Sequence, residues 1–158
     1  MTYPPTQFAS DDLDEALEIA RVTAFATILP VDGTLCDAVF APFVVDGADA
    51  GAVLKAHLLR TNPWHDLLAA GPVEARLVFN AADGYVSPSV YAEKVRSGKV
   101  VPTWNYVAAQ FAGSLEAVPQ DALMDQLDRA GPYGPAHAEP RFVFPAHRLS
   151  RVRAIKDM

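Results

Sequence analysis

The segment Val100-Val101-Pro102-Thr103-Trp104-Asn105-Tyr106 places two large aromatic side chains around an amide, in a composition that favours an extended strand. Side chains alternate between the two faces of a strand, so Trp104 and Tyr106 share one face and Asn105 lies on the other. Aromatic residues that share a strand face most often belong to a core, but they also stack on flat rings. Both interpretations stay open for this segment.

A second segment lies upstream and reads Lys55-Ala56-His57-Leu58-Leu59-Arg60-Thr61-Asn62-Pro63-Trp64. Asn62-Pro63 is typical of an N-cap followed by proline at the first helical position. Backbone N–H groups at a helix start favour an anion, and Arg60 can bind a phosphate through two parallel hydrogen bonds. His57 reaches the same anion only if the strand ends or bulges near Leu59. The alternative is that Asn62 merely caps a helix and Arg60 lies in solvent.

A third segment, Gly84-Tyr85-Val86-Ser87-Pro88-Ser89-Val90-Tyr91-Ala92-Glu93-Lys94, repeats the cap-plus-proline pattern at Ser87-Pro88. It predicts a helix that runs to about Arg96 and ends at Gly98. Tyr91 and Lys94 would lie on this helix, where a hydroxyl and an ammonium group can contact a phosphate or a sugar-like chain. A capped helix with Tyr91 packed on the rest of the fold is an equal alternative.

Hydrophobic periodicity and turn signals predict a mainly β protein, an antiparallel, Greek-key-like barrel with peripheral helices. Asp12–Arg21 is expected to be a short amphipathic helix, and the segment after Asn62-Pro63 a helix that ends at Gly71-Pro72. Pro42 suggests a sheet edge or a bulge. The expected strands are Ala24–Leu29, Leu35–Val45, Ala52–Leu59, Val73–Asn80 and Val100–Val118, with turns at Asp32-Gly33, Asp46-Gly47 and Asp83-Gly84.

The C-terminal part of the chain is expected to contain a helix over Gln120–Ala130 and a loop over Gly131–Pro140. Arg141–Met158 forms a basic tail, with a helix after Pro145 as one interpretation. Its cations could contact DNA, anionic lipid or an acidic partner, although such a run is more often a solvated helix face.

Bulk composition predicts one domain over residues 1–158 in a cytoplasmic setting. The formal net charge of -6 opposes non-specific binding to nucleic acid, so a DNA contact would need a local basic patch. Cys36 is the single cysteine, which excludes an internal disulfide. No apolar stretch reaches the roughly 20 residues needed to span a bilayer, so no membrane contact is expected. The histidine and cysteine spacing predicts no metal site.

Together, these segments resemble the PaiB-type negative transcriptional regulators, a family of FMN-binding split-barrel proteins. The resemblance rests on His57–Trp64, on Gly84–Lys94 and on the string Val101–Tyr106, with Tyr3–Phe8 and Phe25–Thr27 fitting its N-terminus. It covers residues 1 to about 118. It implies a homodimer that holds FMN at the subunit interface, with a flavin-dependent redox or sensing role.

The resemblance also assigns candidate cofactor-binding residues. The phosphate end would use His57, Leu58, Arg60, Thr61 and Asn62. Supporting contacts would come from Ser87, Tyr91 and Lys94, and contacts to the flavin ring from the second subunit would come from Trp104 and Asn105.

This chain departs from the family pattern at several histidines. Phe40 stands where the family typically has histidine. Ala82-Asp83-Gly84 replaces a typical Pro-His pair, Ala109-Gln110 replaces Val-His, and Val90 replaces a tryptophan. These changes remove candidate acid–base groups and haem ligands, while a phosphate site survives them. The alternative function is therefore a non-catalytic regulator or interaction module that keeps the barrel and has lost flavin.

Overall fold

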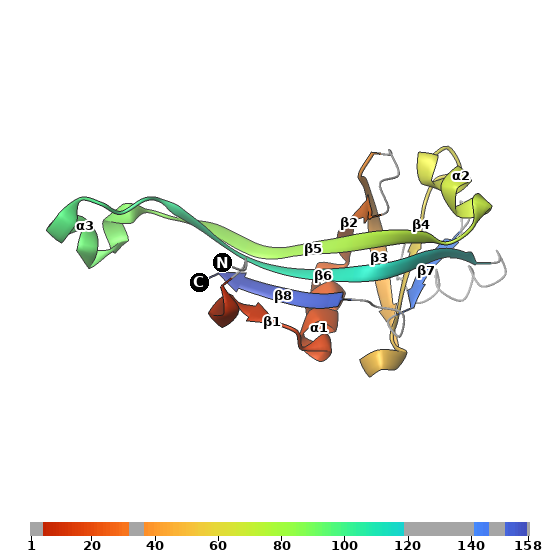
Figure 1. The fold of residues 1–158 in the computed structure, drawn as a ribbon, viewed down its shortest axis with the longest axis horizontal. Coiled ribbons are helices and arrows are strands. Elements are labelled where there is room, and N and C mark those ends of the chain that lie inside the picture. Colours follow the sequence, from red (N-terminus) through yellow and green to blue (C-terminus); the bar gives the residue numbers. More distant parts are fainter. Residues whose placement is uncertain (1–4, 32–36, 119–140, 146–150, 158) are drawn as a thin grey trace.

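The computed structural model describes residues 5–31, 37–118, 141–145 and 151–157, and within them an eight-stranded sheet in which every pairing is antiparallel (Figure 1). The strands follow one another in the spatial order β1-β8-β6-β5-β2-β3-β4-β7. Their bounds are β1 Ala9–Ser10, β2 Phe25–Pro30, β3 Val39–Asp46, β4 Val53–His57, β5 Val73–Val86, β6 Thr103–Val118, β7 Arg141–Pro145 and β8 Arg151–Asp157.

The sheet closes on itself because β6 also pairs with β7, through Glu116–Val118. Strands β6, β5, β2, β3, β4 and β7 therefore form a ring, while β8 and β1 extend the sheet from another stretch of β6. Pro42, which lacks a backbone N–H, lies where β3 changes partner: Val39–Pro42 pairs with β2, and Phe43–Asp46 pairs with β4. The predicted antiparallel barrel is confirmed.

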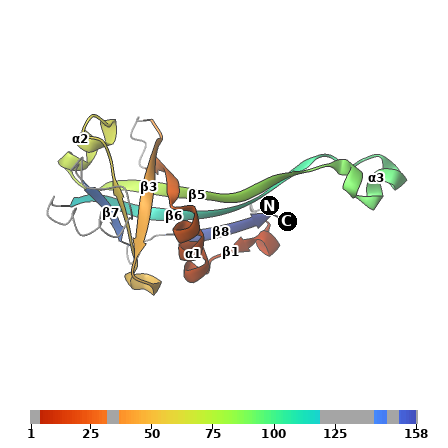
Figure 2. The same cartoon turned by 180° about the vertical axis from the view of Figure 1, so that it is seen from behind.

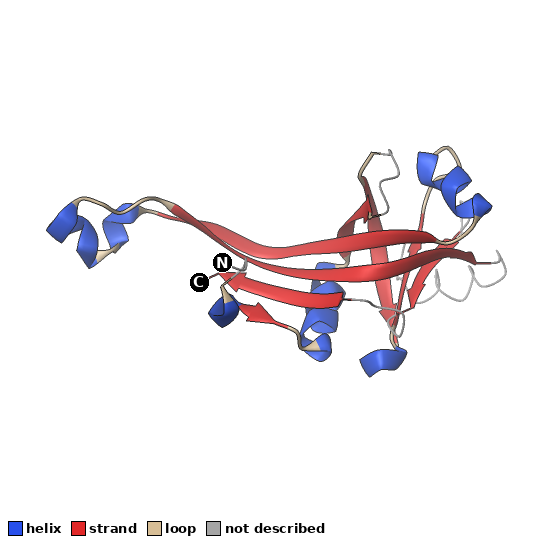
Figure 3. Cartoon of the chain, viewed as in Figure 1, coloured by secondary structure: helices blue, strands red, loops and turns tan. Residues whose placement is uncertain are grey.

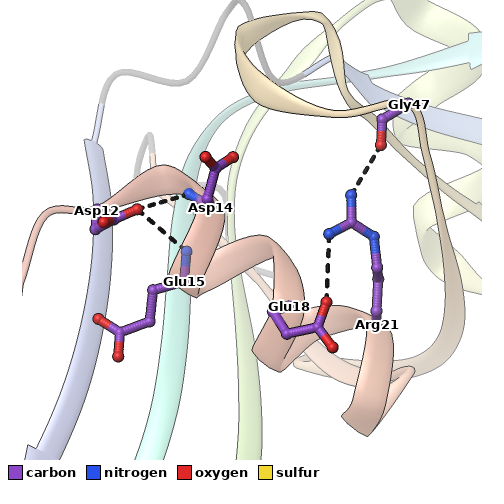
Figure 4. A network of polar contacts seen from close by, with 6 residues as sticks. All are labelled: Asp12, Asp14, Glu15, Glu18, Arg21 and Gly47. Carbon is purple, nitrogen blue, oxygen red and sulfur yellow. Dashed lines mark hydrogen bonds and ion pairs between the residues drawn. The ribbon is translucent and has the colours of Figure 1, made fainter.

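Helix α1 (Leu13–Thr23) is the predicted amphipathic helix, and polar contacts hold it near both ends. The Asp12 carboxylate accepts hydrogen bonds from the backbone N–H groups of Asp14 (2.9 Å) and Glu15 (3.2 Å), as Figure 4 shows. At the other end, Arg21 donates to the Gly47 carbonyl at 2.8 Å. This bond ties α1 to the turn between β3 and β4.

The interior is filled by one face of α1 and by the inward side chains of the strands. Ala16, Leu17 and Ala20 of α1 are fully buried. Phe79 of β5 lies at the centre of an aromatic cluster, with its ring centroid 5.6 Å from that of Phe43 and 5.7 Å from that of Phe111. Both contacts are edge-to-face, the geometry that aromatic quadrupoles favour.

Strands β5 and β6 continue beyond the barrel as a two-stranded ribbon, with helix α3 (Ala92–Ser97) and the 3₁₀ turn η3 (Pro88–Val90) at its tip (Figures 1 and 2). We call residues 83–106 the arm. Asp83-Gly84 was expected to end the fourth strand, and this is wrong: β5 shifts register between Asn80 and Asp83 and then stays paired with β6 as far as Val86. A β-bulge thus replaces the predicted turn.

Two helix predictions are wrong. The helix from Ser87 to Arg96 is wrong, because Tyr91 is extended (φ -94°, ψ 125°) and separates η3 from α3. A helix after Pro145 is also wrong, since the backbone of Arg151–Asp157 pairs with β6 as a strand. The hairpin at Asp32-Gly33, the helix over 120–130 and the loop over 131–140 lie outside the described residues, as does Cys36.

The helix expected after Asn62-Pro63 is present, whereas strands β1 and β7 and the turns η1 (Thr6–Phe8) and η2 (Asp49–Gly51) were not predicted. Helix α2 covers Pro63–Ala70 and ends at Gly71, and these two turns complete the helical elements of the described chain (Figure 3). In those same ranges, none of the helices combines the length and the apolar character of a membrane span.

Candidate functional site

The predicted phosphate end forms a tight turn between β4 and α2. Strand β4 ends at His57, and the backbone N–H of Asn62 donates to the Leu59 carbonyl at 2.9 Å, which makes Leu59–Asn62 a β-turn. Arg60 and Thr61 occupy its two central positions and are exposed. The strand therefore ends where the convergence of His57 and Arg60 requires it to end.

The side chains of this turn divide into core and surface. Leu58 is 4% exposed and belongs to the hydrophobic core, so only its backbone is open to a ligand. His57, Arg60 and Thr61 are exposed, and within the described residues none of them makes a side-chain hydrogen bond or an ion pair. A guanidinium, an imidazole and a hydroxyl thus lie exposed beside a helix start, without a partner among the residues that the structure describes. This donor set fits a phosphate group.

Asn62 caps helix α2, as the alternative to a phosphate contact predicted. Its side-chain oxygen accepts from the Trp64 backbone N–H at 3.0 Å. Trp64 is fully buried, and its indole N–H donates to the Asp37 carbonyl at 3.0 Å. The start of α2 is therefore fixed in place by a cap and by a buried anchor, which makes the turn before it a rigid platform.

We expect Asn62→Ala to lower the free energy of unfolding by about 1 kcal/mol, because the N-terminal N–H groups of α2 lose their acceptor. Chemical denaturation followed by circular dichroism measures this loss. Asn62→Ser, which can still cap the helix, is the matched control and should stay close to the unsubstituted chain. Equal losses in both variants would show that the capping oxygen does not contribute the stability.

The residues of the second predicted cluster lie on the arm. Ser87 caps η3, accepting from the Ser89 N–H at 3.3 Å and contacting the Ser89 hydroxyl at 2.9 Å. Lys94 reaches forward to the Gly98 carbonyl at 3.5 Å, at the end of α3, and does not extend back towards Ser87. Tyr91 lies between the two helical turns and is exposed, so of the two alternatives the one that packs it on the rest of the fold is wrong.

We call Leu59–Asn62 the phosphate turn, after its predicted ligand. The arm and the phosphate turn lie at opposite ends of the molecule. Figures 1 and 2 show α2 at one end of the long axis and α3 at the other. Strand β5 spans most of the interval, and its 12 steps from Val73 to Tyr85 correspond to about 40 Å at 3.3 Å per residue. Ser87, Tyr91, Lys94, Trp104 and Asn105 therefore cannot contact a phosphate held by Arg60 of the same chain.

One face of the arm is aromatic. In the ribbon Tyr85 pairs with Trp104 and Asp83 with Tyr106, and paired residues of an antiparallel ribbon share a face. The rings of Tyr85 and Trp104 lie with centroids 6.1 Å apart and are 58% and 57% exposed. Core packing of Trp104, the interpretation that composition favours, is therefore wrong.

Asn105 lies on the opposite face of the ribbon, across from Gly84, as strand alternation predicts. A single flat ring cannot lie against Trp104 and Asn105 at once, except at the edge of the ribbon. Three residues of the aromatic face were not among the predicted site residues: Tyr106, two positions after Trp104 on the same strand, and Asp83 and Tyr85 on the partner strand. The register of the ribbon brings the latter two beside Trp104, and no local sequence signal reports that register.

These features define a class. A mainly antiparallel barrel of this kind is the fold of FMN-binding split-barrel proteins. The chain belongs to the family described as "Putative FMN-binding domain", whose model matches residues 2–139. This match supports FMN as the cofactor.

Similar proteins of known structure share this fold. Flavocytochrome Anf3 from Azotobacter vinelandii has a TM-score of 0.70 and 13% identity, covering 99% of this chain and 72% of that one. The FAD and haem binding protein from Mycobacterium smegmatis has a TM-score of 0.66 and 17% identity, covering 95% and 74%. An uncharacterized protein of Emericella nidulans is 35% identical over 91 residues, 48% of this chain, and the chain covers only 36% of its length.

Proposed function

We propose that the chain binds FMN as a homodimer, with each flavin held between the phosphate turn of one copy and the arm of the other. The observation that carries this proposal is the separation of the two ends: the exposed Arg60 guanidinium beside α2 and the exposed aromatic face at Trp104 cannot meet on one chain. A mononucleotide needs both kinds of contact close together. A two-fold dimer supplies them twice, since each copy offers one turn and one arm.

In this arrangement Arg60, His57 and Thr61 bind the phosphate, with backbone donors from Leu58 to Asn62 in support. Trp104 of the second copy stacks on the flavin ring, and Asn105 reaches it only at the ribbon edge. Ser87, Tyr91 and Lys94 also come from the second copy, as contacts to the chain between phosphate and ring. Bound FMN supplies one- and two-electron redox chemistry, which serves either an oxidoreductase or a flavin sensor.

A complementation experiment tests this arrangement. Arg60→Ala and Trp104→Ala chains, carrying different tags, should each bind FMN more weakly than the unsubstituted chain as homodimers. Their heterodimer contains one site with both residues intact and one site with neither. We expect tag-purified heterodimers to bind one FMN per dimer with the unsubstituted affinity, measured by flavin absorbance and fluorescence titration. If both residues came from the same chain, every heterodimer site would carry one defect, and no tight site would appear.

A colourless protein that also fails to take up added FMN would favour the alternative function, an interaction module that keeps the barrel without the flavin. The PaiB-type role in transcriptional regulation stays a prediction. The net charge of -6 opposes DNA contact by the chain as a whole, so such binding would depend on the basic stretch over 141–158. Gel-shift assays that compare the unsubstituted chain with an Arg151→Gln, Arg153→Gln double variant, which keeps the backbone pairing of β8, would identify that contact.

A further inference from the structure

We propose that Asp83 is the positioning residue that fixes the indole of Trp104 as a stacking platform for a flat ring. This inference rests on the proposed function, because it assigns the residue that prepares the ring end of the same site. The Trp104 indole N–H donates to the Asp83 carboxylate at 2.9 Å. Asp83 lies on the aromatic face of the arm and is itself exposed.

The bond is not needed to satisfy the indole. Trp104 is 57% exposed, so water could accept from its N–H equally well. What a carboxylate adds is a single orientation, because a charge-assisted hydrogen bond restricts a ring that would otherwise sample several rotamers. Tyr85, tilted by 53° to the indole, flanks it on the neighbouring strand. An ordered platform binds a ring more tightly, since less side-chain freedom is lost on binding.

The position of Asp83 is set by the bulge in β5. The register shift between Asn80 and Asp83 brings the carboxylate opposite Tyr106 and diagonally across from Trp104. Without that shift, Asp83 would lie on the other face of the ribbon and could not accept from the indole. The bulge therefore places the acceptor where a regular ribbon would not.

A double-mutant cycle with FMN as the probe tests the proposal. We expect Asp83→Ala to weaken FMN binding by about three- to tenfold through loss of preorganisation. Asp83→Asn, whose amide oxygen can still accept from the indole, should bind within about twofold of the unsubstituted chain. In a Trp104→Phe background, which has no N–H to fix, Asp83→Ala should cause no further loss. Asp11→Ala, another exposed carboxylate, is the matched control.

A readout that needs no flavin accompanies the cycle. The chain has two tryptophans, Trp104 and the buried Trp64, and therefore two indole N–H signals in an NMR spectrum. The signal that is missing from the spectrum of a Trp104→Phe variant belongs to Trp104. Asp83→Ala should shift the Trp104 signal and leave that of Trp64 in place. An unmoved Trp104 signal, unchanged FMN affinity, or an equal loss in the Trp104→Phe background would each overturn the proposal. If the unsubstituted chain bound no FMN, the proposed function would fall as well.

Discussion

Replacing Arg60 with alanine is expected to weaken FMN binding about 10- to 100-fold. Arg60 is exposed in the turn before α2 and has no side-chain partner in the described part of the chain, so in the proposed site it contributes a charge-assisted, two-pronged contact to the phosphate, worth roughly 1.5–3 kcal/mol. Its exposure to solvent screens part of this energy and places the expectation towards the lower end of the range. Titration of the apoprotein with FMN, followed by flavin fluorescence, measures the change.

Two comparisons separate the phosphate contact from general charge. Riboflavin lacks the phosphate, so its affinity should be the same for the unsubstituted chain and for Arg60→Ala. Arg76→Ala removes another exposed arginine from β5 and should leave FMN binding unchanged. A fall in riboflavin affinity that matches the fall for FMN would show that Arg60 acts on the fold or on the ring, and the phosphate assignment would be lost.

The start of α2 was predictable because its signals are local. Asn62-Pro63 specifies a capped helix start within two residues, and the structure places the cap there with its oxygen bonded to the Trp64 N–H. The sequence showed that His57 and Arg60 can converge only if β4 ends nearby, but it could not show that β4 does end there. The end of a strand depends on where its neighbouring strand stops pairing with it.

The arm was not predictable, because it depends on pairing between residues that are far apart in the sequence. Asp83-Gly84 is among the strongest local turn signals, yet these residues stay in a ribbon because Asn105 and Tyr106, more than 20 positions away, supply their backbone partners. Long-range pairing of this kind overrides local preference. The backbone of Arg151–Asp157 joins the sheet in the same manner, although its composition suggested a helix.

Phe79→Ala is expected to lower the free energy of unfolding by about 3–5 kcal/mol, the typical cost of removing a buried phenyl ring. Phe79 is fully buried and makes edge-to-face contacts with Phe43 and Phe111, so its loss leaves a cavity between β3, β5 and β6. For a chain of this length the melting temperature should fall by about 10 °C. Urea denaturation followed by circular dichroism checks the first figure, and a thermal melt the second.

Phe40→Ala is the matched control, since Phe40 also stacks on another phenylalanine but is 63% exposed. It should cost less than about 1 kcal/mol, because most of its surface stays in water. Equal costs for the two variants would contradict the assignment of Phe79 to the centre of the core.

Phe79 precedes the bulge by one residue, so the same cavity lies at the root of the arm. We therefore expect Phe79→Ala to weaken FMN binding as well, through the position of Trp104, while Phe79→Leu restores both stability and binding in large part.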